Sequence, residues 1–587
     1  MIKSSFARFG CHLSCWSQKW VVLSIIVVQL LLSSMLYAQN AADSTGVSTE
    51  VVDVVKSYTP TIIIRPKSKW QIMGQKDDLI PQTEFNYVHE VMGFSPSDLP
   101  SILAPSSPWK EKEPKNLPNY LRILLGTRAS AGLESFVIHE FNKDSYLTAA
   151  LDHQQLKGQI EGVTLSTDWA ESNLRTQWHS TIENRASTLG LSLKRSAVQW
   201  YGIPDTLSID PSITADFGQT YHRSTLYHRL GTNGGWFTGM DNEFYLFSDQ
   251  YGITEWQFSS APKAEFLWDK RLFSLAAHLS FLSMNLGLED TAITSKDYTA
   301  FNADLGVQTD LDFGDLKVNL GARVWGHNGS SENTLRLFPE LELNYPIFER
   351  RLHVYAGFSG QYQQYQANGL TQTQAFIAPG FELKPQIDKQ ILRFGVHGAP
   401  NDLWQYQLGV SFRNFENQAY FIRRPWSGEQ GLFAYDNGNS FNLLYAQGTE
   451  LKYTAKINGR LSDQWDIALD VALIDNRPAN DVEPWNIPTL SFGGSGTYHF
   501  NDQLLLTGRF MSYGSRKDQL ILADEVSDQV VDGFIDAQLH VHYSINKNFS
   551  TSLSGINLLN QNSGLWINYP VQGTRVNLGL QYNFKSF

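Results

Sequence analysis

The chain lacks most of the features on which soluble enzymes depend. Its only cysteines, Cys11 and Cys15, precede the one long apolar run, at 20–37, so the chain beyond that run has no thiol for a disulfide, a metal or a nucleophile. Phosphate-binding, zinc-protease, calcium-loop and serine-hydrolase motifs are all missing. The net charge is −12 and no basic run is present, which argues against a nucleic-acid partner. We therefore expect no enzyme activity, no cofactor and no nucleic-acid binding.

Long apolar runs are also scarce, and the mean hydropathy of −0.28 argues against a helical membrane protein. The run at 20–37 follows three basic residues and no acidic residue, which is the order found in signal peptides. We predict cleavage after Ala38, so the mature chain would begin at Gln39. A signal anchor is the alternative interpretation of the same segment.

Strict alternation of apolar and polar residues is what the chain has instead. Over 575–585 every even position is apolar and every odd position is polar or glycine, so a strand there has one apolar and one polar face. Similar segments recur from about residue 120 onward, at the length of a tilted transmembrane strand. Since charges are costly in lipid, we expect the apolar face to contact the membrane and the polar face to line an aqueous lumen. The apolar residues of this barrel-terminal strand are Val576, Leu578, Leu580, Tyr582 and Phe584.

The turns between these segments alternate in length, and this alternation indicates a topology. The hairpin at 301–324 is the clearest, with apolar residues on one face and Asp304, Asp310 and Asp312 on the other. Outer-membrane barrels have short periplasmic turns and longer external loops. Counted in this way, the chain has roughly 20 to 24 strands, an even number. Short polar turns are predicted at 268–271, 314–315, 348–350, 388–389, 462–463, 501–502 and 546–548, with longer links between them.

The fold predicted from these patterns is all-β: a large antiparallel transmembrane β-barrel in the outer membrane of a Gram-negative cell. Three parts are expected: a signal peptide at 1–38, a proline-rich and mostly irregular periplasmic extension at 39–118, and the barrel at 119–587. Aromatic residues make up 13% of the chain, which suits aromatic belts at two membrane surfaces. The expected general partners are outer-membrane lipid and the barrel-assembly machinery.

Two histidines form the one candidate pair of metal ligands. His540 and His542 lie two residues apart on one strand, so both side chains face the lumen and could bind a metal. Two polar lumen residues without a metal are the simpler interpretation, and we favour it. The sequence therefore predicts no metal site and no catalytic residue.

A short valine-rich segment close behind the leader suggests a periplasmic partner. Its residues are Glu50, Val51, Val52, Asp53, Val54 and Val55. Such a segment could add as a strand to the sheet edge of another protein. It resembles the box through which TonB-dependent receptors engage their energising partner, so we refer to it as the TonB-box-like segment. A plain periplasmic strand is the alternative.

The C-terminal part of the chain resembles the end of TonB-dependent-receptor barrels. An asparagine-bounded apolar motif at 555–560 is followed by Tyr569-Pro570, by Gly573 and Arg575, and then by the alternating final strand. The pattern departs from the family in two places, because a threonine separates that glycine from the arginine and three residues follow the last apolar strand position.

Further motifs resemble a plug-less, receptor-like subgroup of these outer-membrane β-barrels. They are the segment 54–61, the barrel entry with Tyr120, Gly126 and Gly132, and the tripeptide at 200–202. A full receptor carries a folded plug before its barrel, and 39–118 is too short and too rich in proline for one. The resemblance implies a transporter or channel for solutes across the outer membrane. A structural or docking component of an envelope complex, without transport activity, is the alternative.

Overall fold

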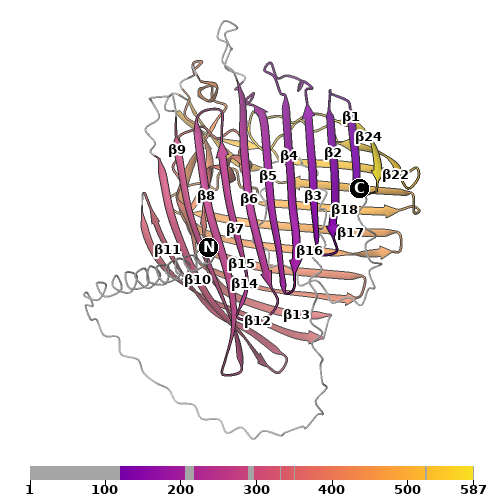
Figure 1. Cartoon of the computed structure of the whole chain (residues 1–587). Coiled ribbons are helices and arrows are strands. Elements are labelled where there is room, and N and C mark those ends of the chain that lie inside the picture. The colour runs from indigo at the N-terminus through magenta and orange to yellow at the C-terminus, as the bar shows by residue number, and fades with distance from the viewer. Residues whose placement is uncertain are drawn as a thin grey trace, which may run out of the picture. The chain divides into compact units, whose positions relative to one another are not determined.

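The computed structural model describes residues 119–204, 217–287, 297–330, 332–348, 351–426, 428–431, 433–522 and 525–585. These residues form a closed antiparallel β-barrel of 22 strands (Figure 1). The prediction of a large all-β barrel with an even number of strands is confirmed. The predicted signal peptide at 1–38, the predicted extension at 39–118 and its segment Glu50 to Val55 lie outside the described residues. Within the described ranges, no helix is long and apolar enough to span a membrane.

The strands run in chain order around the ring, and one extra hairpin, β20–β21, stands apart from it. Within the part of the chain that the structure describes, one α-helix, α2 (Ala367–Thr373), and a short 3₁₀ helix, η2 (Ala434–Asp436), lie in loops. The strands are β1 (Asn119–Gly126), β2 (Ala131–Asn142), β3 (Ser145–Leu156), β4 (Trp169–Ile182), β5 (Arg185–Gln199), β6 (Gly218–Thr232), β7 (Phe237–Ser248), β8 (Ile253–Trp268), β9 (Arg271–Leu286), β10 (Tyr298–Phe313), β11 (Leu316–Gly329), β12 (Asn333–Phe348), β13 (Leu352–Gln364), β14 (Pro385–Asn401), β15 (Trp404–Arg423), β16 (Phe441–Ser462), β17 (Trp465–Pro478), β18 (Leu490–His499), β19 (Leu504–Tyr513), β20 (Arg516–Leu522), β21 (Glu525–Val531), β22 (Phe534–Ser544), β23 (Phe549–Ile556) and β24 (Arg575–Phe584).

The first and last strands close the ring. β1 pairs with β24 along its whole length, from Asn119 opposite Phe584 to Gly126 opposite Asn577. β19 pairs directly with β22, which leaves the β20–β21 hairpin as part of the loop between them. Closure removes every exposed strand edge, so all backbone groups at membrane depth can pair within the wall.

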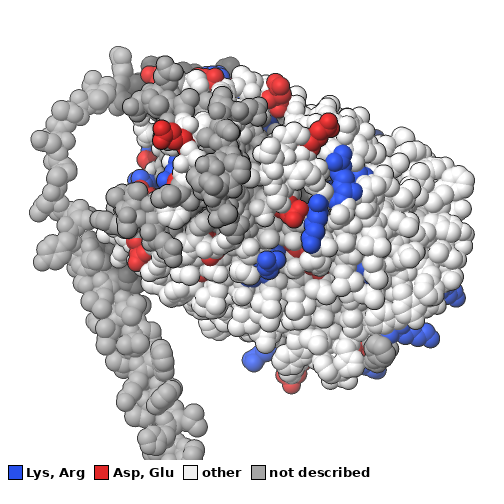
Figure 2. Space-filling model, turned by 90° about the horizontal axis from the view of Figure 1, so that it is seen from above, with Lys and Arg blue, Asp and Glu red and all other residues white. Residues whose placement is uncertain are grey.

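The outer face of the barrel is apolar, as the alternation predicts. On β10, Phe301 and Leu305 are 46% and 52% exposed, whereas Asn302 and Asp304 between them are buried on the lumen side. Seen from above, charged side chains gather on one part of the surface and a broad part carries none (Figure 2). An uncharged outer wall on a closed barrel is the form that outer-membrane proteins take, and this places the protein in a Gram-negative outer membrane.

Exposed aromatic side chains lie near the strand ends that carry the short turns. Trp178 on β4, Trp236 in the β6–β7 turn, Trp268 on β8 and Phe313 on β10 are all exposed. Amphipathic rings favour the headgroup level of a bilayer, so these residues form part of an aromatic belt.

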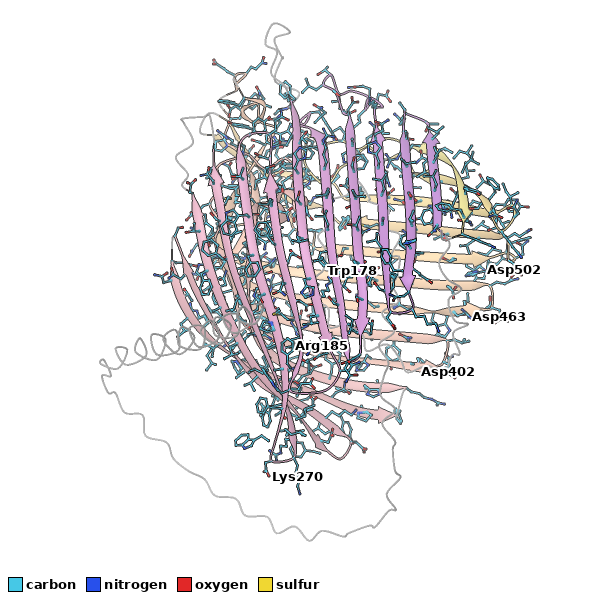
Figure 3. The ribbon with its side chains drawn as sticks, in the orientation of Figure 1. Trp178, Arg185, Lys270, Asp402, Asp463 and Asp502 are labelled. Carbon is cyan, nitrogen blue, oxygen red and sulfur yellow. The ribbon has the colours of Figure 1, made fainter. Side chains whose placement is uncertain are left out.

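Short turns connect the strands around one rim of the barrel, where Figure 3 labels residues of five of them. These labels are Lys270, Asp402, Asp463 and Asp502 in four of the turns, and Arg185 at the start of β5, directly after a fifth turn. In outer-membrane barrels this rim is periplasmic. Of the predicted turns, those at 268–271, 314–315, 462–463, 501–502 and 546–548 lie where the structure has one, and 348–350 falls partly outside the described residues.

One predicted turn is wrong. Asp388 and Lys389 lie inside β14, where the pairing with β15 shifts register between Asp388 and Gln390. The neighbouring pairs β13–β14 and β15–β16 also shift register nearby. The dipeptide resembles a turn because a bulge, like a turn, interrupts the alternation of a strand. Asp388 is 1% exposed and takes part in the wall network described below.

Candidate functional site: a lid of external loops over the lumen

The largest buried apolar cluster of the described residues joins external loops to the inner face of the strands that carry them. We call the described residues of four loop segments, 200–217, 365–384, 424–440 and 557–574, the lid. The loop between β5 and β6 and the loop between β15 and β16 begin on nearly opposite sides of the ring. A contact between these two loops therefore spans the external mouth of the barrel. Buried lid residues of this cluster include Trp200, Leu370, Phe376, Ile377, Phe381, Leu383, Tyr435, Trp566 and Tyr569.

Hydrogen bonds between the segments join the lid into one unit. Trp200 Nε1 donates to the carbonyl of Ala375 at 3.1 Å, and Tyr221 on β6 donates to the same carbonyl at 2.7 Å. Asn439 Nδ2 donates to the carbonyl of Trp200 at 2.7 Å, and the Tyr569 hydroxyl donates to the carbonyl of Asn439 at 2.5 Å. These groups are buried and obtain their partners from other loops, so opening the lid would leave them unpaired.

Two motifs of the receptor resemblance meet at the centre of the lid. The Tyr201 hydroxyl donates to the carbonyl of Pro570 at 2.8 Å, and the rings of Tyr201 and Tyr569 are 5.1 Å apart. Phe376 stacks on Tyr569 with ring centroids 3.6 Å apart. A Cβ atom at Gly202 would lie 2.2 Å from the Tyr569 ring, so glycine is required for this approach. The tripeptide at 200–202 and the Tyr569-Pro570 pair therefore form one contact.

Helix α2 fixes the β13–β14 segment to the wall at β7 and β8. The Glu255 carboxylate on β8 accepts hydrogen bonds from the backbone amides of Ala367 and Asn368, at 2.7 and 3.1 Å, in the first turn of α2. Tyr245 on β7 donates to the same carboxylate at 2.9 Å. A carboxylate at these otherwise unpaired amides stabilises the start of a helix.

The β20–β21 hairpin holds the fourth lid segment from the side. Arg516 donates to the carbonyls of Gly564 and Leu565, both at 2.7 Å. Asp518, two residues on, is fully buried, and this burial raises the pKa of its carboxyl to about 6, against the opposing effect of Arg423. Charged side chains of this hairpin therefore border the lid, whose centre is aromatic.

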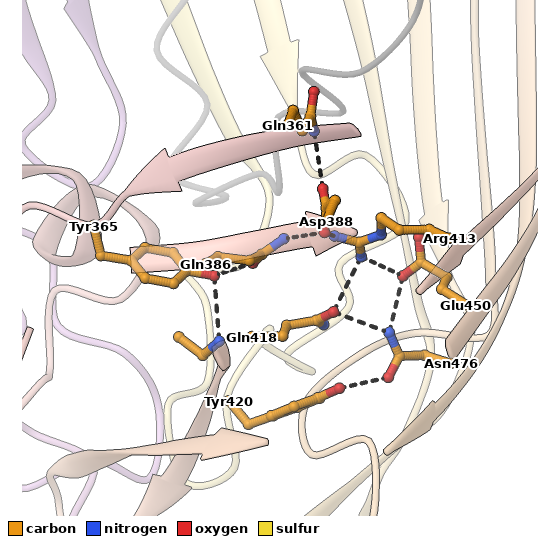
Figure 4. Close-up of polar contacts among 10 residues, drawn as sticks. Gln361, Tyr365, Gln386, Asp388, Arg413, Gln418, Tyr420, Glu450 and Asn476 are labelled. Carbon is orange, nitrogen blue, oxygen red and sulfur yellow. Dashed lines mark hydrogen bonds and ion pairs between the residues drawn. The ribbon is translucent and has the colours of Figure 1, made fainter. Parts of the chain in front are cut away.

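A buried polar network supports the lid from the lumen side of β13 to β17 (Figure 4). Asp388 accepts hydrogen bonds from Gln361 at 2.9 Å, from Gln386 at 3.0 Å and from Arg413 at 3.1 Å. Arg413 also pairs with Glu450 at 3.0 Å. The guanidinium therefore bridges two carboxylates from two different strands.

The network reaches the lid through Tyr365, the first residue of the β13–β14 segment. Its hydroxyl donates to Gln386 at 2.5 Å and accepts from the backbone amide of Ala419 at 3.2 Å. The position of this lid segment is consequently coupled to the bulged part of the wall, where Asp388 lies.

Two adjoining cavities lie beside the 557–574 segment of the lid. The larger, about 450 Å³, is lined by the lumen face of β19, β22, β23, β24 and β1 to β3 and by this segment. The smaller, about 110 Å³, is lined largely by aromatic and aliphatic side chains of the lid. His540 and His542 line the larger cavity, and His540 Nδ1 lies 2.7 Å from Ser554 Oγ. Among the described residues no three His, Cys, Asp or Glu side chains are grouped as metal ligands.

The residues of the terminal strand lie on two faces of β24. Leu578 and Leu580 are 53% and 61% exposed, whereas Asn577 and Gln581 line the larger cavity. Val576 and Tyr582 are exposed with the two leucines, and Phe584 ends the strand beside β1.

Sequence reasoning missed the lid, because its residues come from four loops with no periodic pattern.

No family model and no curated protein matches the sequence. Solved structures do match the fold. The siderophore receptor PirA of Acinetobacter baumannii aligns with a TM-score of 0.61 and 11% identity over 80% of each chain. The FrpB iron transporter of Neisseria meningitidis aligns with a TM-score of 0.61 and 12% identity, over 80% of this chain and 82% of that one. A variant of the ferric enterobactin receptor PfeA of Pseudomonas aeruginosa aligns with a TM-score of 0.58 and 12% identity, over 79% of this chain and 80% of that one. The described chain therefore has the fold of a TonB-dependent siderophore receptor barrel.

Proposed function

We propose that the protein is a gated transporter that moves a solute across the outer membrane. The observation that supports this most strongly is the lid, in which four external loops interlock over a lumen enclosed by 22 strands. A barrel of this size encloses a wide lumen unless something fills or covers it. A lid held by side-chain contacts can open and close, and this distinguishes a gated transporter from an open channel.

Conductance across a planar bilayer tests this proposal. The wild-type protein is expected to be silent, because the closed lid blocks ions. The double variant Trp200→Ala/Tyr569→Ala removes the two aromatic side chains at the lid centre and should produce discrete conductance steps. Tyr543→Ala, which removes an exposed ring from the outer wall, is the matched control and should remain silent.

Two outcomes would contradict the proposal. Equal conductance in the wild-type protein and the lid variant would mean that the lid does not gate the lumen. Silence in both, with correctly folded barrels on heat-modifiable gels, would favour the alternative of a structural or docking component with a permanently blocked lumen.

We further propose that the N-terminal extension couples the barrel to a TonB-type partner in the periplasm. The box-like segment from Glu50 to Val55 would add as a strand to the partner's sheet edge. Val52→Pro removes a backbone donor that strand addition requires, so capture of a TonB periplasmic domain should fall to background. Val47→Pro, outside the segment, should leave capture unchanged, and equal capture by both variants would exclude this segment as the coupling site.

A further inference from the structure

The larger cavity has the shape of a recess in the lumen wall. Its lining includes a run of small residues where β1 meets β2 and where β23 ends, namely Ser130, Ala131, Gly132, Ser554 and Gly555. Because these side chains are short, the lumen wall is indented there, and the longer side chains around them form a rim. At about 450 Å³ the recess has the volume of a small-molecule site.

The charged part of the rim is mainly cationic. Arg122 on β1, Arg509 on β19 and Arg575 on β24 all line the recess, and Asp536 is the one carboxylate among the lining residues. Arg122 is paired with Glu134 at 2.9 Å, and even with this carboxylate counted the arginines outnumber the acids. The formal charge of this set of side chains, with Glu134 included, is therefore positive. His540 and His542 add two further nitrogen-bearing rings to the same wall.

The smaller cavity adds an aromatic side to the recess. The two cavities share the lining residues Leu156, Trp169, Phe534, Val571 and Gln572, so they adjoin. The smaller one is also lined by Tyr201, Phe376, Trp566 and Tyr569 of the lid. A bound molecule could therefore place acidic groups against the arginines and a flat apolar group against the lid.

We propose that this recess binds a small polycarboxylate, and that an aromatic ring on the ligand strengthens the binding. Guanidinium groups recognise carboxylates by charge-assisted, often bidentate hydrogen bonds. Because the recess lies beside the 557–574 segment, its ligand would contact the underside of the lid. A small polycarboxylate would then be the cargo of the proposed transporter, and this assignment of cargo rests on the proposed function.

Calorimetric titration of the detergent-solubilised, full-length barrel tests the site with two probes that each carry three carboxylates. Citrate is the aliphatic probe and trimesate, the benzene tricarboxylate, is the aromatic one. Both should bind, and trimesate should bind more tightly. Arg509→Gln and Arg575→Gln should each weaken binding about tenfold, the effect of losing one charge-assisted contact. Arg122 is left intact because its removal would leave Glu134 without its cation.

The matched control is Arg393→Gln, which changes an arginine of β14 that is not part of the recess. Its binding should equal that of the wild-type protein. No binding of either probe to the folded wild-type barrel, or equal weakening by all three variants, would overturn the site. Equal affinity for citrate and trimesate would overturn the aromatic part.

The titration and the conductance experiment test separate claims, so either claim can be rejected while the other is retained. Binding that depends on Arg509 and Arg575 in a protein whose lid variant remains silent would retain the site and reject gated transport. A conducting lid variant with no binding in the wild-type protein would retain the transporter and reject this recess as its cargo site.

Discussion

Arg413→Gln is expected to lower the free energy of unfolding by about 3–5 kcal/mol, because it removes the only cation that joins two buried carboxylates in the wall network. The side chains of Asp388 and Glu450 are 2% and 13% exposed, and both accept hydrogen bonds from Arg413. Without the guanidinium they face each other in a medium of low dielectric constant. Urea titration of the liposome-inserted barrel, followed by tryptophan fluorescence, measures the loss.

Arg460→Gln is the matched control for this change. Arg460 on β16 pairs with Asp466 at 3.2 Å, but both side chains are about 40% exposed near the periplasmic rim. Exposed ion pairs contribute about 0–1 kcal/mol, so this variant should unfold almost as the wild type does. Adding Asp388→Asn and Glu450→Gln to Arg413→Gln should restore much of the lost stability, because no unpaired charge then remains buried. Equal losses of unfolding free energy in Arg413→Gln and Arg460→Gln would show that the network is solvated.

The same variant should disturb the lid. Tyr365 joins the network to the β13–β14 segment, so movement of Gln386 and Asp388 would reach α2 and the aromatic centre. Conductance of Arg413→Gln in a bilayer would detect this coupling as brief openings, at a temperature where the barrel is still folded.

The wall could be predicted from the sequence because its determinants are local. In the hairpin at 301–324 the alternation fixes which side chains face lipid, and Gly314, with φ of +68°, permits the tight turn. The observed register, with Phe313 opposite Leu316, follows from the length of that turn. The alternation of apolar and polar residues is strict because each strand contacts lipid on its outer face and water on its inner face.

The lid could not be predicted in the same way, since its contacts join residues far apart in the sequence. The tripeptide at 200–202 and Tyr569 each belong to a recognisable motif, but neither motif contains information about the other. Asp388 illustrates the converse failure. The local dipeptide resembles a turn, and only its contacts with Arg413 and Gln361, on neighbouring strands, make it part of a wall.

Leu305→Arg is expected to destabilise the barrel by about 2–4 kcal/mol if this side chain lies near the bilayer midplane. Leu305 lies in the middle of β10 on the outer face, opposite Val324 of β11 and Ala277 of β9. An arginine there must either remain in hydrocarbon or bend toward a headgroup, and both carry a cost in free energy.

Gln308→Arg places the same side chain on the other face of the same strand, beside Asp310. This face is in contact with water, so the unfolding free energy should change by no more than about 0.5 kcal/mol. Gln581 would be a poorer choice for this control, because it accepts two hydrogen bonds from Arg122 and an arginine there would oppose that charge. The difference between the Leu305 and Gln308 variants isolates the effect of lipid from that of an added arginine. Equal unfolding midpoints in liposomes would mean that the outer face of β10 does not contact hydrocarbon, which would contradict the orientation on which both the lid and the recess depend.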